Sequence, residues 1–298
     1  MRRLTELQPK AAEPWWLVAR AQLQAQDSKA ALEALNNSLA VQGDYLPALI
    51  TRVQVQASNK QFKEALDGAR AIQRQFADRA VGYQLEGDVL VAQKQLPAAI
   101  NAYRTAYDKT PSAALALALA GVQRESGDAP GAVQSLRQWL QANPKDMQVR
   151  SQLGVYLELM KRPDEAISEY EQVLAVAPDN VVILNNLAGL YGSRGDTRAI
   201  KYAERAVELS QNRPEVVDTL GWVLVQNNQV PRGLTLLKQA AIQAPHIPEI
   251  RYHLAMAYHK AGQVAEARKE LEGLLKTTKE FEGAKEAQAL LDSLKKQP

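Results

Sequence analysis

The feature that most constrains this chain is a short motif that returns at a nearly fixed interval. NNLAGLY occupies residues 185–191, and the related stretches DTLGWVL and YHLAMAY occupy residues 218–224 and 252–258. Their starts are separated by 33 and 34 residues. Self-similarity at such a period is typical of proteins in which one small supersecondary unit is stacked many times. The sequence therefore predicts an array of repeats.

Extending this interval in both directions divides residues 12–281 into eight repeats, six of 34 residues and two of 33. The repeats are 12–45, 46–79, 80–112, 113–146, 147–180, 181–213, 214–247 and 248–281. Counted within each repeat, position 8 is small in seven of eight repeats and position 20 in all eight. Position 8 holds Ala19, Val53, Gly87, Ala120, Gly154, Ala188, Gly221 and Ala255. Position 20 holds Ala31, Ala65, Ala99, Ala132, Ala166, Gly233 and Ala267, and Ala199 aligns with them across a one-residue gap in the turn of the sixth repeat.

The spacing of the recurring small and apolar residues within each repeat predicts a pair of α-helices. Positions 4, 7, 8 and 11 follow the i, i+3, i+4, i+7 rule for one helical face, and positions 20, 24 and 27 form a matching stripe on a second helix. A small residue where the two helices cross lets their backbones approach closely. Turn residues separate the two stripes, as in SGDAP at 126–130 and SRGD at 193–196. Good helix formers dominate the chain, so the predicted fold class is all-α.

This pattern resembles the tetratricopeptide repeat over residues 12–281. The resemblance rests on the small residues at positions 8 and 20, on Pro at position 32, and on aromatic residues at positions 4 and 11, namely Trp15, Tyr83, Tyr191 and Tyr258. It implies a right-handed superhelical solenoid of about eight helix-turn-helix repeats. Two departures are local: Val53 replaces a small residue, and the turn of the sixth repeat is one residue shorter. We expect altered packing at both places.

The two ends of the chain differ. Pro9 falls where the proline of a preceding repeat would lie, so residues 1–11 are interpreted as the tail of a truncated repeat. The alternative is a natural N-terminus that begins with a frayed helix. Residues 282–298 are predicted to form a C-terminal capping helix, because Ala287, Leu290, Leu291 and Leu294 share one face.

The sequence offers little that points to catalysis. The net charge of +3, from 36 basic and 33 acidic residues, does not favour nucleic acid as a partner. Cysteine is absent, and no phosphate-binding or nucleophile motif occurs. His253 and His259 lie about 120° apart around a helix, unlike the i, i+4 spacing of helical metal ligands. We therefore expect no catalytic residue, metal or cofactor, and we expect that the chain is not an enzyme.

A binding surface is the remaining prediction. In the tetratricopeptide family the first helix of each repeat lines the concave side, so the resemblance implies a concave groove lined by Asn185, Asn186, Asp218, Trp222, Glu249, Tyr252, His253, Met256 and His259, with Trp16 and Arg20 near the N-terminus. We expect Tyr252 and Met256 to lie near Trp222. Trp222 either contributes to ligand binding or packs between repeats. The residue pairs that clamp a chaperone C-terminus in some family members do not occur here.

A narrower resemblance covers about a quarter of the chain. The phrases NNLA, AERAVEL, DTLGWVLVQ and PEIRYHLAMA are similar to those of bacterial repeat lipoproteins of the PEP-CTERM type, which accompany exopolysaccharide export and protein sorting. This implies a periplasmic scaffold that binds a protein or peptide, held to a membrane only through a lipidated N-terminus outside this sequence; the alternative location is cytoplasmic. Two other functions stay open: a carbohydrate-binding surface, and the recognition arm of a larger enzyme.

Overall fold

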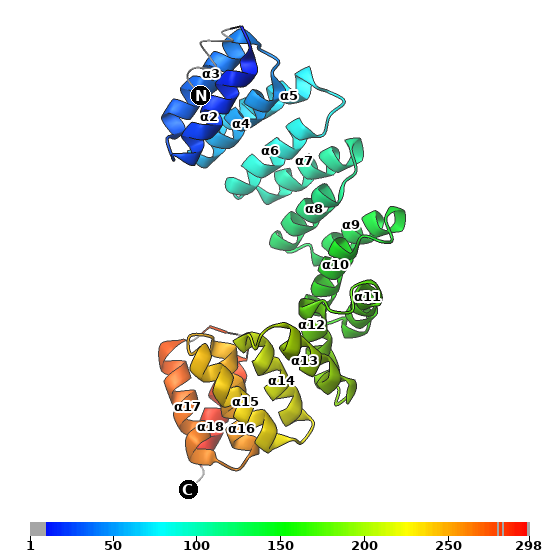
Figure 1. Ribbon diagram of the computed structural model, residues 1–298, viewed down its shortest axis with the longest axis vertical. Helices are drawn as coiled ribbons and strands as arrows, with labels where there is room; N and C mark the ends of the chain where they lie inside the picture. Colours follow the sequence, from blue (N-terminus) through cyan, green and yellow to red (C-terminus); the bar gives the residue numbers. More distant parts are fainter. Residues whose placement is uncertain (1–9, 279, 282, 297–298) are drawn as a thin grey trace. The chain divides into compact units, whose positions relative to one another are not determined.

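The computed structural model describes residues 10–278, 280–281 and 283–296. Within these residues it contains seventeen α-helices and no strand, which confirms the all-α prediction (Figure 1). The helices are α2 (Ala12–Gln24), α3 (Ser28–Val41), α4 (Leu46–Ser58), α5 (Phe62–Gln75), α6 (Val81–Ala92), α7 (Leu96–Lys109), α8 (Ala113–Glu125), α9 (Ala129–Ala142), α10 (Met147–Leu159), α11 (Pro163–Val176), α12 (Val181–Gly192), α13 (Arg198–Leu209), α14 (Pro214–Gln226), α15 (Val230–Gln243), α16 (Pro248–Lys260), α17 (Val264–Thr277) and α18 (Ala284–Leu294). The proposed N-terminal tail lies almost wholly outside the described residues.

The chain divides into two compact units, residues 1–156 and 157–298, and each is described by itself. In the N-terminal unit, α2 to α9 form four helix pairs in chain order (Figure 1). In the C-terminal unit, α12 to α17 form three pairs, and α18 packs on α17. Even-numbered helices up to α16 are the first helices of the sequence repeats, and odd-numbered helices are the second. Within the described residues, no helix is both long enough and apolar enough to cross a membrane.

The same backbone turn joins the first helix of each repeat to the second. Position 15 has a positive φ in all eight repeats, between 57° and 88°. Around it the backbone forms the two hydrogen bonds of a Schellman motif; in the first repeat these are Asp27 N to Gln22 O and Gln26 N to Leu23 O. Glycine or Asn fills four of these positions, and the other four hold Gln26, Lys60, Lys94 and Lys161. These four residues adopt a conformation that disfavours a Cβ, so the surrounding turn imposes it.

Close approach of the paired helices explains the small residues. All sixteen residues at positions 8 and 20 are buried. At the crossing of α14 and α15, a Cβ on Gly233 would lie 2.5 Å from the carbonyl oxygen of Gly221. A Cβ on Gly221 would lie 2.8 Å from Leu237. Contacts this short do not occur for real Cβ atoms, so packing requires glycine at both places.

Val53, the exception at position 8, is accommodated by a second residue. A Cβ on Gly68 of α5 would lie 2.8 Å from Cγ2 of Val53, so the missing side chain of Gly68 provides the room that Val53 takes. Similarly, Gly87 of α6 makes room for the ring of Tyr103, which would lie 2.9 Å from a Cβ at Gly87. The altered packing expected at Val53 is thus a compensated exchange of large and small residues across the helix pair.

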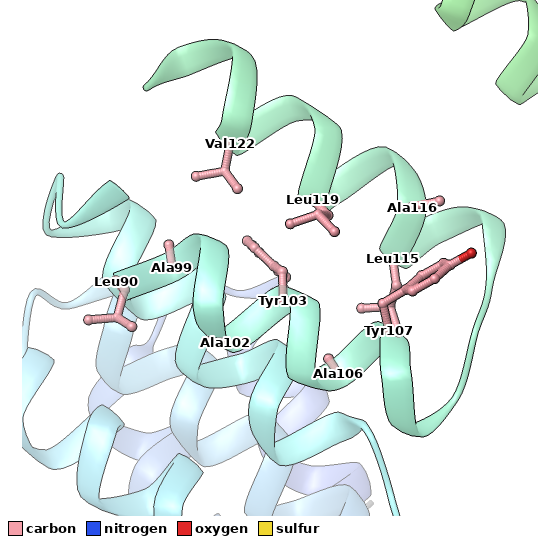
Figure 2. Close-up of a cluster of buried hydrophobic side chains, with 10 residues drawn as sticks. All are labelled: Leu90, Ala99, Ala102, Tyr103, Ala106, Tyr107, Leu115, Ala116, Leu119 and Val122. Atoms are coloured by element: carbon pink, nitrogen blue, oxygen red, sulfur yellow. The ribbon is translucent and has the colours of Figure 1, made fainter. Parts of the chain in front are cut away.

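Tyr103 connects two helix pairs of the N-terminal unit. It belongs to a buried cluster with Ala99, Leu115 and Leu119, and Figure 2 shows it on α7, facing the apolar side of α8. Its hydroxyl donates to Oδ1 of Asp88 at 2.5 Å. Burial raises the pKa of the Tyr103 hydroxyl, and the Asp88 carboxylate raises this pKa further. Tyr103 of α7 therefore packs on α8 through its ring and bonds to Asp88 of α6 through its hydroxyl.

The C-terminal unit ends with α18. This helix buries Ala287, Leu291 and Leu294 against the cluster that contains Ala255, Ala267 and Leu271. Leu290, expected on the same face, is half-buried. In the sixth repeat, α13 has 12 residues where the other second helices have 14, and the side chain of Asp196 accepts from Arg198 N at 2.9 Å. The shortened turn thus delays the start of α13.

Replacing glycine by alanine is expected to change the free energy of unfolding in opposite directions at two helical glycines, Gly233 and Gly121. Gly233→Ala forces a methyl group into the crossing of α14 and α15, and we expect it to lower the free energy of unfolding by about 1–3 kcal/mol. Gly121→Ala in α8 meets no atom within 4 Å. We expect it to raise that free energy by about 0.5–1 kcal/mol, because glycine weakens a helix. Urea denaturation measures both; effects of equal sign would contradict the assigned crossing.

Candidate functional site

The predicted residues of the C-terminal unit lie on its first helices α12, α14 and α16. Helix α14 contacts both α12 and α16, so the three form a continuous row. Positions 5, 6 and 9 of the three helices, together with positions 2, 12 and 13, are called here the first-helix face. It includes Asn185, Asn186, Asp218, Trp222, Glu249, Tyr252, His253, Met256 and His259. All except Asp218 are half-buried, and Asp218 is buried with 6% of its surface exposed.

Three of these residues form a contiguous cluster across α14 and α16. The rings of Trp222 and His253 are stacked, with centroids 4.9 Å apart and planes at 7°. Nδ1 of His253 lies 2.8 Å from Oδ2 of Asp218. An ionised carboxylate can only accept a hydrogen bond, so the hydrogen lies on Nδ1 of His253, which donates the hydrogen bond to Oδ2 of Asp218. Asp218 and Trp222 are one helical turn apart on α14 and hold the imidazole by its edge and by its face.

Trp222 has two environments, and both are contacts within the chain; its part in ligand binding stays a prediction. On one side it packs against the buried cluster of Val225, Leu237 and Leu254, as a scaffold residue does. On another it is stacked on His253, which is half-buried on the first-helix face. The indole therefore anchors a polar group at the surface and also closes the joint between α14 and α16.

Tyr252 has a different environment from the one expected. Its ring lies 6.0 Å from the ring of Phe281, and a Cβ on Gly283 would lie 2.7 Å from Cε1 of Tyr252. The ring stacked on Trp222 is that of His253, and the ring of Tyr252 lies 6.1 Å from it. Burial raises the pKa of Tyr252, and the carboxylate of Glu286 raises it further. Tyr252 is thus part of the joint between α16 and α18.

Several buried polar atoms on this face lack a hydrogen-bond partner among the described residues. They are Oδ1 of Asn185, Oδ1 of Asp218, Oε1 of Gln226 and Nδ1 of His259. Leaving a buried polar atom unpaired costs stability, and more so for a carboxylate. Three of the four residues are among the predicted site residues. The fourth, Gln226, lies at position 13 of α14, which also belongs to the first-helix face.

Asn186 and Lys260 are engaged in contacts within the chain. The amide nitrogen of Asn186 donates to the Tyr170 hydroxyl at 3.1 Å, and this hydroxyl donates to Oε2 of Glu158 at 2.5 Å. Burial, and then the Glu158 carboxylate, raises the pKa of Tyr170. Nζ of Lys260 donates to the carbonyl oxygen of Val225 at 2.7 Å. Both groups thus link adjacent repeats.

Gly189 marks an open place on the first-helix face. It occupies position 9 of α12, as Trp222 does on α14 and Met256 on α16. Gly189 is exposed, and a Cβ there would meet no atom within 4 Å. Packing therefore does not require glycine at this helical position. The signal in the sequence for an open place here was a glycine at position 9, where the next two repeats hold Trp222 and Met256.

The two candidates of the N-terminal unit form their own cluster on α2. Nε1 of Trp16 donates to Oγ1 of Thr51 in α4 at 3.0 Å, and its ring meets that of Tyr45 edge-on at 6.2 Å. The guanidinium of Arg20 lies 5.0 Å from the Trp16 ring. Burial raises the pKa of Tyr45, and Glu13 raises it further. Trp16 is thus held by the following repeat.

Two surface pockets of the C-terminal unit lie away from the first-helix face. One, of about 690 Å³, lies between α11, α12 and α13 and is lined by Leu174, Leu184 and Tyr202. The other, of about 590 Å³, lies between α15, α16 and α17. At the rim of the first pocket, Arg205 donates to Asp179 at 2.8 Å and to Glu208 at 2.6 Å. One guanidinium is thus shared by two carboxylates. In the described part of the chain, no group of three or more His, Cys, Asp or Glu residues is placed to hold a metal ion.

Comparison with protein families identifies repeats in three segments. Two tetratricopeptide-repeat models match residues 85–146 and 148–180. A model of anaphase-promoting complex, cyclosome, subunit 3 matches residues 196–274. These matches support the tetratricopeptide resemblance. They contain nothing that bears on the PEP-CTERM resemblance, which stays a prediction.

Relatives with curated descriptions match only a short part of their own length. Cellulose synthase operon protein C of Komagataeibacter sucrofermentans is 30% identical over 118 residues, which are 37% of this chain and 8% of the relative. Cellulose synthase 1 operon protein C of Komagataeibacter xylinus is 31% identical over 120 residues, 38% of this chain and 9% of the relative. The matched segment thus spans less than a tenth of these proteins.

Solved structures show the fold. The C-terminal part of a TPR repeat-containing protein from Cytophaga hutchinsonii has a TM-score of 0.63 at 15% identity and covers 80% of this chain and 99% of that one. The APC/C hetero-tetramer Cut9-Hcn1 gives a TM-score of 0.59 at 13% identity, covering 90% of this chain and 52% of that one. The predicted tetratricopeptide-repeat fold is confirmed by these likenesses.

The environment of Tyr252 gives a prediction about α18. Gly283 has φ of 90° and abuts the Tyr252 ring, so Gly283→Ala adds both backbone strain and a clash. We expect a loss of about 2–4 kcal/mol in the free energy of unfolding, with faster hydrogen exchange in α18. Gly262→Ala is the matched control, because φ is 74° there and no atom lies within 4 Å. Equal losses of free energy in both variants would contradict the assignment of Tyr252 to the joint between α16 and α18.

Proposed function

We propose that this chain, which has the tetratricopeptide-repeat fold, is a non-catalytic scaffold that binds a protein or peptide partner on the first-helix face of its C-terminal unit. The observation that carries the proposal is the cluster of Asp218, His253 and Trp222. It places a buried carboxylate with one unpaired oxygen at a position where an apolar side chain would suffice for packing. A costly polar group at an interaction face is what recognition of a polar partner requires.

The proposed setting is the bacterial envelope, in exopolysaccharide export or protein sorting. Two sequence similarities support this setting. The sequence phrases resemble those of PEP-CTERM-type lipoproteins, and relatives at 30–31% identity are named for a cellulose synthase operon. In this proposal the chain is a periplasmic part of a longer lipoprotein, anchored through an N-terminus outside this sequence. A cytoplasmic location is the alternative.

A carbohydrate-binding surface is a weaker second candidate. Sugar rings stack on open aromatic faces, and one face of Trp222 is covered by His253. Trp16 is bordered by Tyr45 and Arg20. The third candidate, a recognition arm of a larger enzyme, is favoured only by the greater length of the curated relatives.

Capture from a bacterial envelope extract tests the proposed function. The baits are the wild type, Trp222→Ala and Trp16→Ala, the last as a matched half-buried tryptophan of the other unit. We expect a partner that Trp16→Ala retains and Trp222→Ala loses, with an affinity at least about tenfold lower, because aromatic anchors dominate binding energy. Circular dichroism controls for folding. Retention by Trp222→Ala and loss by Trp16→Ala would transfer the site to the N-terminal unit.

A further inference from the structure

We infer that the first-helix face of the C-terminal unit selects a basic side chain, lysine or arginine, on an extended peptide that crosses α12 at Gly189. The inference rests on the proposed function and names the chemistry of the partner. Its elements are an open backbone at Gly189, buried acceptors on α12 and α14 without a donor among the described residues, and an excess of negative charge on α14 and α16.

Gly189 supplies the place where a peptide backbone comes close. The other helical glycines of α12, α14 and α15 are required by packing: a Cβ on Gly192, Gly221 or Gly233 would lie within 2.8 Å of an atom of the neighbouring helix. Gly189 has no such neighbour, yet it weakens its helix. Gly121 of α8 is open in the same way, so an open position 9 provides room for a peptide backbone, and the polar groups of α12 and α14 distinguish Gly189 from Gly121.

Two buried acceptors, one on α12 and one on α14, could accept hydrogen bonds from a ligand. Asn185 lies one helical turn before Gly189 on α12, and Asp218 occupies the equivalent position on α14. Oδ1 of each is buried and has no donor among the described residues. A lysine or arginine brings several N–H donors to one point. Because Oδ1 of Asp218 is covered in the free protein, entry of the donor needs a rotamer change beside it, as is common at interfaces.

The charges of the face favour a cation over a neutral donor. Helix α12 has no charged residue, and α14 has Glu215 and Asp218. On α16, Glu249 belongs to the same face and Arg251 is paired with Glu270 at 2.6 Å. Lys260 bonds to a carbonyl oxygen and keeps its positive charge, so it offsets one of the three carboxylates of Glu215, Asp218 and Glu249. His253 is bonded to Asp218 through one oxygen only. A basic side chain complements the remaining acidic groups, and a sugar hydroxyl would leave their charge in place.

Fluorescently labelled nonapeptide pools test the inference with the full chain. Each pool is randomised except for a central Arg, Lys, Gln or Glu, and fluorescence anisotropy measures binding; cellopentaose is the competing sugar probe. We expect the Arg and Lys pools to bind at least about tenfold more tightly than the Gln pool, since charged pairs in a part-buried site are worth at least this ratio. Trp222→Ala should weaken binding of every pool.

Four variants separate recognition from folding. Asp218→Asn keeps the shape and should abolish the preference for Arg and Lys, and Glu215→Lys, at an exposed position, should reduce it. Gly189→Leu should melt at or above the wild-type temperature and yet lose at least about tenfold in affinity. Gly121→Leu, at the same position of α8 with equally open space, should melt similarly and bind as the wild type does.

The outcomes distinguish the inference from the proposed function. Pools that bind through Trp222 without preferring Arg or Lys overturn the inference and leave the scaffold function standing. Wild-type affinity in Gly189→Leu overturns the assignment of the peptide to α12. Absence of peptide binding, or binding unaffected by Trp222→Ala, contradicts the proposed function itself. Binding of cellopentaose that Gly189→Leu removes would replace the peptide by a sugar.

Discussion

The close crossing of two helices within each repeat is the constraint on which the rest of the structure depends. At Gly221 and Gly233 the two backbones approach so closely that a single methyl group does not fit. This contact buries one face of each helix and commits small residues to positions 8 and 20. The outer positions of the first helices are then not needed for the crossing within the repeat. Because other residues form the crossing, Asp218 and Gly189 occupy positions that the crossing does not need, and Trp222 packs between α14 and α16.

The period and the two small positions sufficed to predict the helices, because helix pairing is a local property that repeats along the chain. Residue-level packing was less accessible. The exchange of Val53 with Gly68 could be found only by pairing each position 8 with the residues that face it. Lys60, Lys94 and Lys161 in left-handed turns have no sequence signal, since the fixed turn geometry overrides their preference.

The candidate site shows the same division. The spacing of the repeat placed Asp218, Trp222 and His253 on one surface, and the structure places them there. It did not predict that His253, rather than Tyr252, stacks on Trp222. That choice is made by Phe281 and Gly283, which precede α18 and lie against the Tyr252 ring. Side chains one residue apart on a helix are thus assigned to different neighbours by elements that no repeat pattern describes.

The repeat architecture also explains how such a site is tolerated. In a stacked array each repeat contacts only its neighbours, so stability is roughly a sum of repeat and interface terms. The unpaired oxygen of Asp218 and the glycine at 189 weaken only the interfaces of α12, α14 and α16, while α18 strengthens the same unit by burying Leu291 and Leu294. A compact core would spread such a cost over the whole domain. Here the cost of a destabilising residue on the first-helix face is confined to its own repeat and to the interfaces with the neighbouring repeats, so residues can vary there without loss of the fold.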